Sequence, residues 1–343
     1  MTISATDFRM PVLGADMQAG TLVAWRKGAG DAVRRGEIIA EVDTEKGVID
    51  VEAFHDGVLD EIVVPVGQKV PVGTVIARFR RDAGAEAAAE GVAARPAARP
   101  AQEPRTPVAG ERPRAAAPAP DRLQRMRQTI AAAMARSKRE IPHYYLATTI
   151  DLHRATAWLA DVNAARPIET RLLPGVLLLK ATALALRAVP ELNAVWDQER
   201  VVLRDTVHVG VAISLRGGGL VILALHDTAT RSLDDLMDGV RDLTARARAG
   251  RMKSSELADS TITVTSLGDR GVESVYGVIY PPQVAIVGFG TVLQRPWVVD
   301  GDVRPRPVVT VTLAADHRVS DGHRGGLFLE EVGRLLQEPE KLR

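Results

Sequence analysis

Residues 82–120 cannot contribute to a folded core, and they divide the chain. This stretch is rich in alanine, proline, arginine and glutamate, has seven prolines between Pro96 and Pro120, and has no aromatic residue. Such a composition buries too little apolar surface to offset the entropy lost on ordering. It predicts a linker that is extended where proline is dense. The 343-residue chain should therefore hold folded units at 1–81 and 121–343, joined by the linker 82–120.

The overall composition excludes several classes of protein. The formal net charge of +1 gives no reason to expect binding to nucleic acid or to an anionic membrane. The chain has no cysteine, so disulfides, cysteine-ligated zinc and a cysteine nucleophile are excluded. Its most apolar segment, 172–189, contains Pro174, Lys180 and Arg187, which favours a buried helix over a membrane span. The N-terminal residues lack a signal pattern, so we expect a cytoplasmic protein.

The first unit contains an internal repeat with an offset of 37 residues. Residues 30–40 align with residues 67–77, and Gly20 and Leu22 align with Gly57 and Leu59. Each copy has short β-branched runs separated by glycines, without a helical period. The repeat predicts an all-β domain of two small sheets packed face to face.

Lys46 lies between the two copies of the repeat. Two strand-like runs flank Thr44, Glu45, Lys46 and Gly47, and Gly47 suits a turn position that needs a positive φ. The sequence therefore predicts Lys46 at the exposed tip of a hairpin. An exposed lysine is usually only solvated, but this one is singled out by its place between two quasi-symmetric halves.

This unit resembles lipoyl domains. Residues 10–14, Trp25, residues 30–33, Gly36 and residues 41–47 all match the family pattern. The resemblance implies that Lys46 carries lipoate in amide linkage. Biotin is the alternative cofactor. Related biotin carriers usually have methionines beside the lysine, and the Glu45 and Gly47 found here favour lipoate.

The second unit alternates helical and strand-like segments. Apolar runs predict buried strands at 144–150, 206–214, 220–225, 261–266, 283–288 and 308–316. Helices are expected from residue 121, from Asp151, over 175–189, after Ser232 and over 325–336. We expect a layered α/β domain with a mixed sheet.

His317 is the candidate base of this unit. It follows an apolar strand and precedes a helix, within residues 315–322. A neutral imidazole, with a reference pKa of ~6.5, can take the proton of a thiol, with a reference pKa of ~8.5, at a cost that positioning can offset. Thiolate is the form that attacks a thioester. On chemistry alone, a structural hydrogen-bonding role for His317 remains equally open.

Residues 122–343 resemble the dihydrolipoamide acyltransferase (E2) components of 2-oxo-acid dehydrogenase complexes. The matching segments are 137–143, 190–193, 263–268, 281–288 and 313–322. The resemblance implies a chloramphenicol-acetyltransferase-like fold, in which trimers form active sites between subunits and assemble into larger cores. It implies that His317 is the base toward the thiol of coenzyme A, and that Thr265 donates its hydroxyl to the oxyanion. Asp321 would be an orienter paired with a basic residue of 137–139.

Several other polar residues receive no catalytic role. We expect Asn193 to be structural, His143 to pack at the first strand, and His323 to be a solvated residue at the start of a helix. The remaining histidines are scattered without the spacing of metal ligands, so no metal is expected.

Two departures from the E2 pattern bear on function. Bacterial E2 chains commonly carry a small helical subunit-binding domain between lipoyl and catalytic domains, and no such motif is visible here. Leu223 stands where the family commonly has a proline, near the path of coenzyme A. The first departure affects how partner enzymes dock, and the second affects how coenzyme A is positioned as the acceptor.

The expected function is acyl transfer, acetyl first, between S-acyl-dihydrolipoamide on Lys46 and coenzyme A. The chain would be the E2 core of a pyruvate or acetoin-type dehydrogenase complex, a homotrimer that assembles further and works with E1 and E3 enzymes. The alternatives are an E2 for branched-chain or succinyl groups, and a non-catalytic lipoyl carrier and scaffold.

Overall fold

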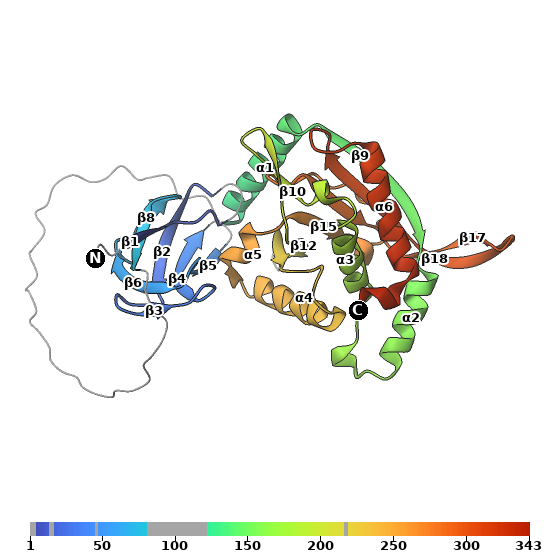
Figure 1. Cartoon of the computed structure of the whole chain (residues 1–343), viewed down its shortest axis with the longest axis horizontal. Helices are drawn as coiled ribbons and strands as arrows, with labels where there is room; N and C mark the ends of the chain where they lie inside the picture. The colour runs from blue at the N-terminus through green and yellow to red at the C-terminus, as the bar shows by residue number, and fades with distance from the viewer. Residues whose placement is uncertain (1–4, 14–16, 45–46, 81–121, 216–218) are drawn as a thin grey trace, which may run out of the picture.

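A computed structural model of the chain describes residues 5–13, 17–44, 47–80, 122–215 and 219–343. These residues form a small all-β domain and a larger α/β domain (Figure 1). The predicted linker, 82–120, lies outside the described residues. None of the helices in the described ranges is long and apolar enough to cross a membrane.

Two antiparallel sheets form the N-terminal domain. Their strands are β1 (Ala5–Arg9), β2 (Ala19–Trp25), β3 (Ala32–Val33), β4 (Ile38–Thr44), β5 (Gly47–Glu52), β6 (Gly57–Ile62), β7 (Lys69–Pro71) and β8 (Val75–Arg80). One sheet has the order β1-β8-β6-β3 and the other β5-β4-β2-β7, with β14 (Met252–Lys253) of the second domain added beside β5. The 37-residue offset relates β2 to β6, β3 to β7 and β4 to β8, so the predicted pair of related sheets is confirmed.

The glycines of the repeat adopt matching backbone conformations. Gly30 and Gly67 have φ of 96° and 89°, and Gly36 and Gly73 both have φ of 83°. Only glycine adopts such angles without strain. The two sheets bury one shared core, whose largest members include Phe8, Leu22, Ile39, Leu59 and Phe79.

The second domain is a mixed sheet with helices packed on it. Its helices are α1 (Arg122–Glu140), α2 (His153–Ala164), α3 (Pro174–Ala185), α4 (Leu233–Arg248), α5 (Ser254–Ala258) and α6 (Gly322–Gln337), with 3₁₀ turns η1 (Ile168–Thr170), η2 (Pro190–Leu192), η3 (Gly268–Arg270) and η4 (Pro339–Leu342). The large sheet contains β9 (His143–Asp151), β12 (Val209–Ser214), β13 (Leu220–Leu225), β15 (Ile262–Ser266), β16 (Ala285–Phe289), β17 (Leu293–Val299) and β18 (Asp302–Asp316). Its order is β13-β12-β15-β16-β18-β17, and β9 also pairs with β18. The predicted mixed sheet is confirmed, because β12, β15 and β16 are parallel and the other pairs antiparallel.

Helices α2, α3, α4 and α6 share one apolar core with one face of this sheet. Alternate strand residues point to the two faces. On β15, Ile262 and Val264 belong to the helix-covered core, so Thr263 and Thr265 face the other way. The candidate site residues of this strand therefore lie on the face opposite the four helices.

Two hairpins lie outside the predicted elements. They are formed by β10 (Ala194–Asp197) with β11 (Arg200–Leu203), and by β17 with the first half of β18. The second hairpin projects from the domain (Figure 1). Val298 and Val303 at its end are 69% and 70% exposed, so it lacks the buried apolar face by which a strand is predicted from sequence.

Candidate active site

His317 lies in a tight turn directly after β18. Its backbone N–H donates to the carbonyl of Pro142 at 2.9 Å. The carbonyl of Asp316 accepts from the N–H groups of Val319 and Ser320 at 3.0 and 3.1 Å. The imidazole is exposed in a single chain. A well-anchored backbone therefore presents this side chain at the protein surface.

The two neighbours of His317 in sequence form an ion pair with each other. Arg318 Nε donates to both carboxylate oxygens of Asp316 at 3.0 and 3.1 Å, and Arg318 Nη2 donates to Oδ2 at 2.7 Å. The Asp316 side chain is fully buried, and the guanidinium carbon lies 4.2 Å from the centroid of the Trp196 ring. Because a buried carboxylate is stable only when paired, this ion pair fixes the turn that carries His317.

Tyr144 borders the imidazole of His317. The two rings meet edge to face, with centroids 5.3 Å apart and planes at 65°. The hydroxyl groups of Tyr144 and Ser320 are hydrogen-bonded at 2.9 Å, and burial raises the pKa of Tyr144. Within the described residues of one chain, no group hydrogen-bonds to a ring nitrogen of His317. The imidazole is oriented by packing and keeps both nitrogens available.

Asp321 caps the N-terminus of α6. Its carboxylate accepts a hydrogen bond from the backbone N–H of Arg324 at 3.0 Å, which is the main cause of the lowered pKa of this carboxyl. A backbone hydrogen bond from His323 lowers it further. Arg324 also forms an ion pair with Glu191, which ties the start of α6 to η2.

The basic region predicted to pair with Asp321 makes other contacts. Ser137 Oγ donates to the carbonyl of Ile279 at 2.6 Å, and Lys138 Nζ contacts the hydroxyl of Tyr145. Among the described residues of one chain, Asp321 forms no ion pair with residues 137–139. That pairing therefore stays a prediction.

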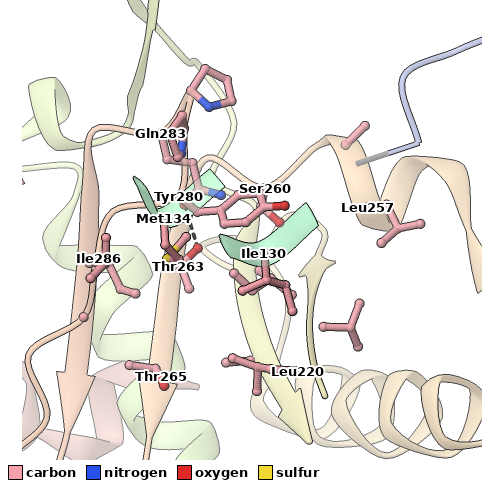
Figure 2. Close-up of a pocket in the computed structure, with 18 of the residues that line it drawn as sticks. Ile130, Met134, Leu220, Leu257, Ser260, Thr263, Thr265, Tyr280, Gln283 and Ile286 are labelled. Atoms are coloured by element: carbon pink, nitrogen blue, oxygen red, sulfur yellow. Dashed lines mark hydrogen bonds between the residues drawn. The ribbon is translucent and has the colours of Figure 1, made fainter. Parts of the chain in front are cut away.

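Thr265 lines a cavity of about 420 Å³ on the face of the sheet opposite helices α2, α3, α4 and α6 (Figure 2). The cavity is mainly apolar, with walls that include Ile130, Met134, Leu220, Leu257, Tyr280 and Ile286. Few polar groups reach it, and the Thr265 hydroxyl is one of them. Such a cavity suits an apolar chain that carries one reactive carbonyl.

Three further polar residues line the same cavity. Thr263 Oγ1 donates to Gln283 Oε1 at 2.7 Å, the dashed contact of Figure 2. Ser260 Oγ is buried and has no hydrogen-bond partner among the described residues. Buried hydroxyls are nearly always paired in folded proteins, so Ser260 offers a hydrogen bond to a ligand.

A second cavity of about 830 Å³ extends toward the turn of His317. Arg318 and Trp196 line it, and it shares Pro281, Pro282 and Gln283 with the first cavity. The peptide bond between the two prolines is cis. The two cavities therefore share a wall made of Pro281, Pro282 and Gln283, with Thr265 on one side and the turn that carries His317 toward the other.

Thr265 and His317 of one chain do not meet. In the sheet register Thr265 pairs with Gly288, and Gly288 pairs with Thr312. Asp316 lies four residues beyond Thr312, at the opposite end of β16. With a rise of ~3.3 Å per residue and a strand spacing of ~4.8 Å, the Cα atoms of Thr265 and Asp316 are roughly 16 Å apart. These two side chains of one chain cannot act on one carbonyl group.

Glu45 and Lys46 lie outside the described residues, but Thr44 and Gly47 on either side of them are described. Thr44 and Gly47 are paired as the last residues of β4 and the first of β5, and Thr44 Oγ1 donates to the Gly47 carbonyl at 2.9 Å. Gly47 has φ of 130°, as predicted for the turn. Only Glu45 and Lys46 connect the two strands.

The other singled-out residues have structural contacts. Asn193 Nδ2 donates to the carbonyls of Arg204 and Thr206 at 2.7 and 3.0 Å. His143 Nδ1 lies 2.8 Å from the Ile141 carbonyl. Leu223, where a proline was expected, is fully buried in the helix-covered core of β13. Its side chain therefore faces away from the cavity that its neighbours Leu220, Val221 and Ile222 line.

Three features of this region were not predicted. The ion pair of Asp316 with Arg318 was visible only as charges on either side of His317, and nothing local shows that they pair. Ser260 and Gln283 come from different strand ends, and only the fold brings them to one cavity. Contacts of this kind depend on tertiary packing, which a single sequence does not display.

Comparisons with known proteins agree with this architecture. The family described as 2-oxoacid dehydrogenases acyltransferase (catalytic domain) matches residues 117–343, and the family described as biotin-requiring enzyme matches residues 6–79. The chain is 25% identical to a dihydrolipoyllysine-residue acetyltransferase component of pyruvate dehydrogenase complex from Zymomonas mobilis, over 97% of this chain and 98% of that protein. It is 28% identical to the protein of that name from Rhizobium meliloti, over 96% and 98%.

Solved structures match the second domain. The Azotobacter vinelandii dihydrolipoamide acetyltransferase aligns with a TM-score of 0.60 and 26% identity, over 64% of this chain and 90% of that one. A probable dihydrolipoamide acetyltransferase from Listeria monocytogenes aligns with a TM-score of 0.58 and 26% identity, over 62% and 91%.

Proposed function

Because the chain belongs to the 2-oxoacid dehydrogenase acyltransferase family, we propose that it transfers an acyl group between a dihydrolipoyl arm on Lys46 and coenzyme A. Acetyl is the preferred group, since the relatives from Z. mobilis and R. meliloti are acetyltransferase components of pyruvate dehydrogenase complex. The proposed layout is a lipoyl domain at 1–81, a linker at 82–120 and a catalytic domain at 121–343.

The spacing of the candidate residues carries this proposal. In the A. vinelandii enzyme a serine, a histidine and an asparagine have been investigated for their role in catalysis. The serine precedes the histidine by 52 residues, and the asparagine follows it by four. Thr265 precedes His317 by 52 residues, and Asp321 follows it by four. The hydroxyl is kept, and a carboxylate replaces the amide.

His317 is the proposed general base. Its turn is fixed by the ion pair of Asp316 with Arg318, and its ring nitrogens have no partner among the described residues of one chain. It removes the proton of the incoming thiol of coenzyme A, or returns it to the departing thiol, so that a thiolate attacks the thioester carbon. Asp321, which caps the next helix, orients this region.

Thr265 is the proposed oxyanion donor. Its hydroxyl lies in an apolar cavity, where a hydrogen bond to developing negative charge is stronger than in water. When the carbonyl carbon becomes tetrahedral, the oxygen gains charge and accepts this hydrogen bond. The apolar walls hold the acyl group and exclude water, which limits hydrolysis of the thioester.

The catalytic centre is proposed to form between two chains. The Cα atoms of Thr265 and Asp316, the residue before His317, lie roughly 16 Å apart, yet Thr265 and His317 must contact the same reacting group. A second copy that brings its His317 to the Thr265 cavity solves this geometry, and a closed ring of copies repeats it. Such a ring fits the homotrimer, assembled into a larger core, that the family resemblance implies.

The proposed attachment site for lipoate is Lys46. The pairing of Thr44 with Gly47 leaves only Glu45 and Lys46 to connect β4 to β5. When attached there, lipoate supplies a dithiol that carries an acyl group as a thioester. The chain itself presents the lysine and holds the hairpin that carries it.

The proposed partners and location follow from the family. The chain works with an E1 oxo-acid dehydrogenase and an E3 dihydrolipoamide dehydrogenase in the cytoplasm. Residues 82–120, where a subunit-binding domain would lie, are outside the described residues. Their sequence shows no recognisable subunit-binding motif, so E1 and E3 are proposed to dock on the catalytic core or through another chain.

Acyl transfer with free dihydrolipoamide and acetyl-CoA tests the function. His317→Ala should lower kcat by about 10²–10⁴-fold. His323→Ala, which removes a nearby exposed imidazole, should keep the wild-type rate. Equal rates for wild type and His317→Ala would leave the non-catalytic carrier and scaffold as the better description. Parallel assays with branched-chain acyl-CoA and succinyl-CoA rank the acyl groups.

Intact mass spectrometry tests the arm. Native chain should carry the mass of lipoate, and a Lys46→Arg variant should carry no added mass. An added mass equal to biotin would replace the lipoyl assignment by a biotin carrier.

A further inference from the structure

The two domains contact each other through a pair of strands. β14 of the second domain runs parallel to β5, with Met252 opposite Ile49 and Lys253 opposite Asp50. β5 is the edge of the N-terminal sheet that continues from the hairpin of Lys46. Figure 1 shows β5 and α5 side by side where the domains meet. An exposed strand edge is a ready template for pairing, and here β14 covers it.

Glu52 fixes this pairing with its backbone and its side chain. The Glu52 N–H donates to Ser254 Oγ at 3.2 Å. Glu52 Oε2 accepts from the Ser255 N–H at 3.3 Å and from the Ser255 hydroxyl, and Lys253 Nζ lies 3.5 Å from Oε1. The Glu52 side chain is only 10% exposed. A carboxylate buried to this extent requires such partners, so the contact is specific.

Apolar contacts accompany these polar ones. Met252 is 1% exposed. Leu257, on α5, packs against the cores of both domains. Glu256 of the same helix is buried and pairs with Arg246, which holds α5 on the second domain independently of the first. The surface that receives β5 is thus built into the second domain.

The contact lies at the rim of the Thr265 cavity. Leu257 and Ala258 of α5 line that cavity, and so does Val12 of the N-terminal domain. Gly47, the first residue after Lys46, is two residues before Ile49, where the pairing with β14 begins. The contact therefore brings the arm-bearing end of the first domain beside the cavity.

We propose that β14 and α5, residues 252–258, are a docking site for the β5 edge of the N-terminal domain, and that docking there presents the Lys46 hairpin to the Thr265 cavity. This inference rests on the proposed acyl transfer and deepens it. The recognition is strand addition, in which main-chain hydrogen bonds give affinity and Glu52 gives specificity. A two-residue pairing is weak, which suits a domain that must also leave. Attachment through residues 82–120 makes weak docking sufficient, because it raises the local concentration of the domain.

Disulfide trapping tests the contact directly. The chain has no cysteine, so Asp50→Cys with Lys253→Cys introduces one pair at matched positions, whose Cα spacing in adjacent strands suits a disulfide. The full chain also carries Lys46→Arg, which removes the thiols of the arm. Glu61→Cys with Lys253→Cys is the control, because Glu61 lies on β6 of the other sheet.

Mild oxidation should link the Asp50 and Lys253 positions at least about tenfold faster than the control pair. The link can form within one chain or between two copies, and both products place the N-terminal domain on residues 252–258. Equal rates for the two pairs would overturn the proposal.

A transfer assay tests the purpose of the contact. Glu52→Arg in the full lipoylated chain should slow transfer from its own acylated arm to coenzyme A by about tenfold. The rate with free dihydrolipoamide should stay at the wild-type level, as should both rates in the control Glu61→Arg. The variant Lys253→Ala with Ser255→Ala, altered on the other side, should reproduce the effect. Unchanged transfer from the arm in both variants would overturn the docking role.

The two tests separate this inference from the proposed function. If the wild-type chain fails with free dihydrolipoamide, the acyltransferase assignment is wrong, while disulfide trapping still reports docking. If the free reaction proceeds and trapping equals the control, the docking site alone is wrong.

Discussion

Asp316 and Arg318 form a bidentate ion pair across the residue that separates them, His317. The carboxylate is fully buried and the guanidinium is 29% exposed. The same carboxylate accepts the Arg318 backbone N–H at 2.9 Å, so one buried anion closes the turn. The position of the proposed base is thus set by its two neighbours.

Removing this anion should weaken both fold and activity. Asp316→Asn keeps the size of the side chain but leaves Arg318 without its charged partner. We expect a loss of ~2–3 kcal/mol in the free energy of unfolding and a lower kcat, because the His317 turn is no longer fixed. Urea titration and the free dihydrolipoamide assay measure the two effects. Wild-type stability in Asp316→Asn would contradict a structural role for the pair.

Thr265 should contribute through its hydroxyl rather than its shape. Thr265→Val keeps the volume and removes the donor, and it should lower kcat by about 10²–10³-fold with little change in KM for coenzyme A. Thr265→Ser keeps the donor and should retain most of the activity. Equal rates for the Val and Ser variants would show that Thr265 only packs against the cavity.

Ser260 should matter for a ligand and not for the fold. Its buried hydroxyl has no partner in the described residues, so Ser260→Ala removes a desolvated group and should leave stability unchanged or higher. If the hydroxyl binds the thiol substrate, KM for coenzyme A should rise by about threefold to tenfold at constant kcat. A thermal melt and initial rates decide this, and an unchanged KM would remove Ser260 from the binding site.

His143 should make stability fall in mild acid. Its Nδ1 lies 2.8 Å from the Ile141 carbonyl, and its Nε2 accepts from the Ile279 N–H at 3.1 Å, a bond that only the neutral ring can accept. Burial lowers the pKa of His143 below its usual 6.5. The unfolded chain then binds more protons just below pH 6.5. The contribution of His143 is complete above that value and is lost as the pH falls toward the folded pKa.

Urea midpoints at about pH 7.5 and about pH 5.5 measure how the stability of the protein changes with pH. His143→Gln should remove the part of the stability loss in acid that His143 causes.

His226 is the opposite case, because its hydrogen bond to Asp259 at 3.0 Å raises its pKa. Its contribution is complete below pH 6.5 and is lost as the pH rises, so His226→Gln should make stability increase more steeply with pH. Identical slopes for the three proteins would contradict both assignments.

The fold was largely predictable from the sequence. The offset of 37 residues predicted the two related sheets. The equivalent glycines of the two copies have similar positive φ angles, so the repeat in sequence is also a repeat in backbone conformation. Continuous apolar runs predicted the central strands of the mixed sheet. The hairpin of β17 with β18 was missed because its outer part has no buried apolar face, and the hairpin of β10 with β11 because each of its strands has only four residues. Asp151 was expected to cap α2, but the cap position is Leu152, and Asp151 Oδ1 instead accepts the His153 N–H at 2.8 Å.

The candidate site was predictable only in part. His317 and Thr265 were found through a resemblance to a family, and the sequence could not show that they lie at opposite ends of one sheet. That result depends on the register of β15, β16 and β18. The pairing of β14 with β5 joins segments about 200 residues apart, as the separation of Glu52 from Ser254 shows. No local pattern indicates such a contact.

Complementation between two inactive variants tests the central claim that acyl transfer occurs at a centre shared by two chains. His317→Ala and Thr265→Val chains carrying different tags would be co-expressed, and mixed assemblies purified through both tags. Each variant alone should be nearly inactive with free dihydrolipoamide and acetyl-CoA. An intact His317 then meets an intact Thr265 at about one interface in three in a mixed trimer and about one in four in a large core, so the mixture should regain roughly a quarter to a third of the wild-type rate. A mixture no more active than the two variants assayed separately would contradict the shared centre.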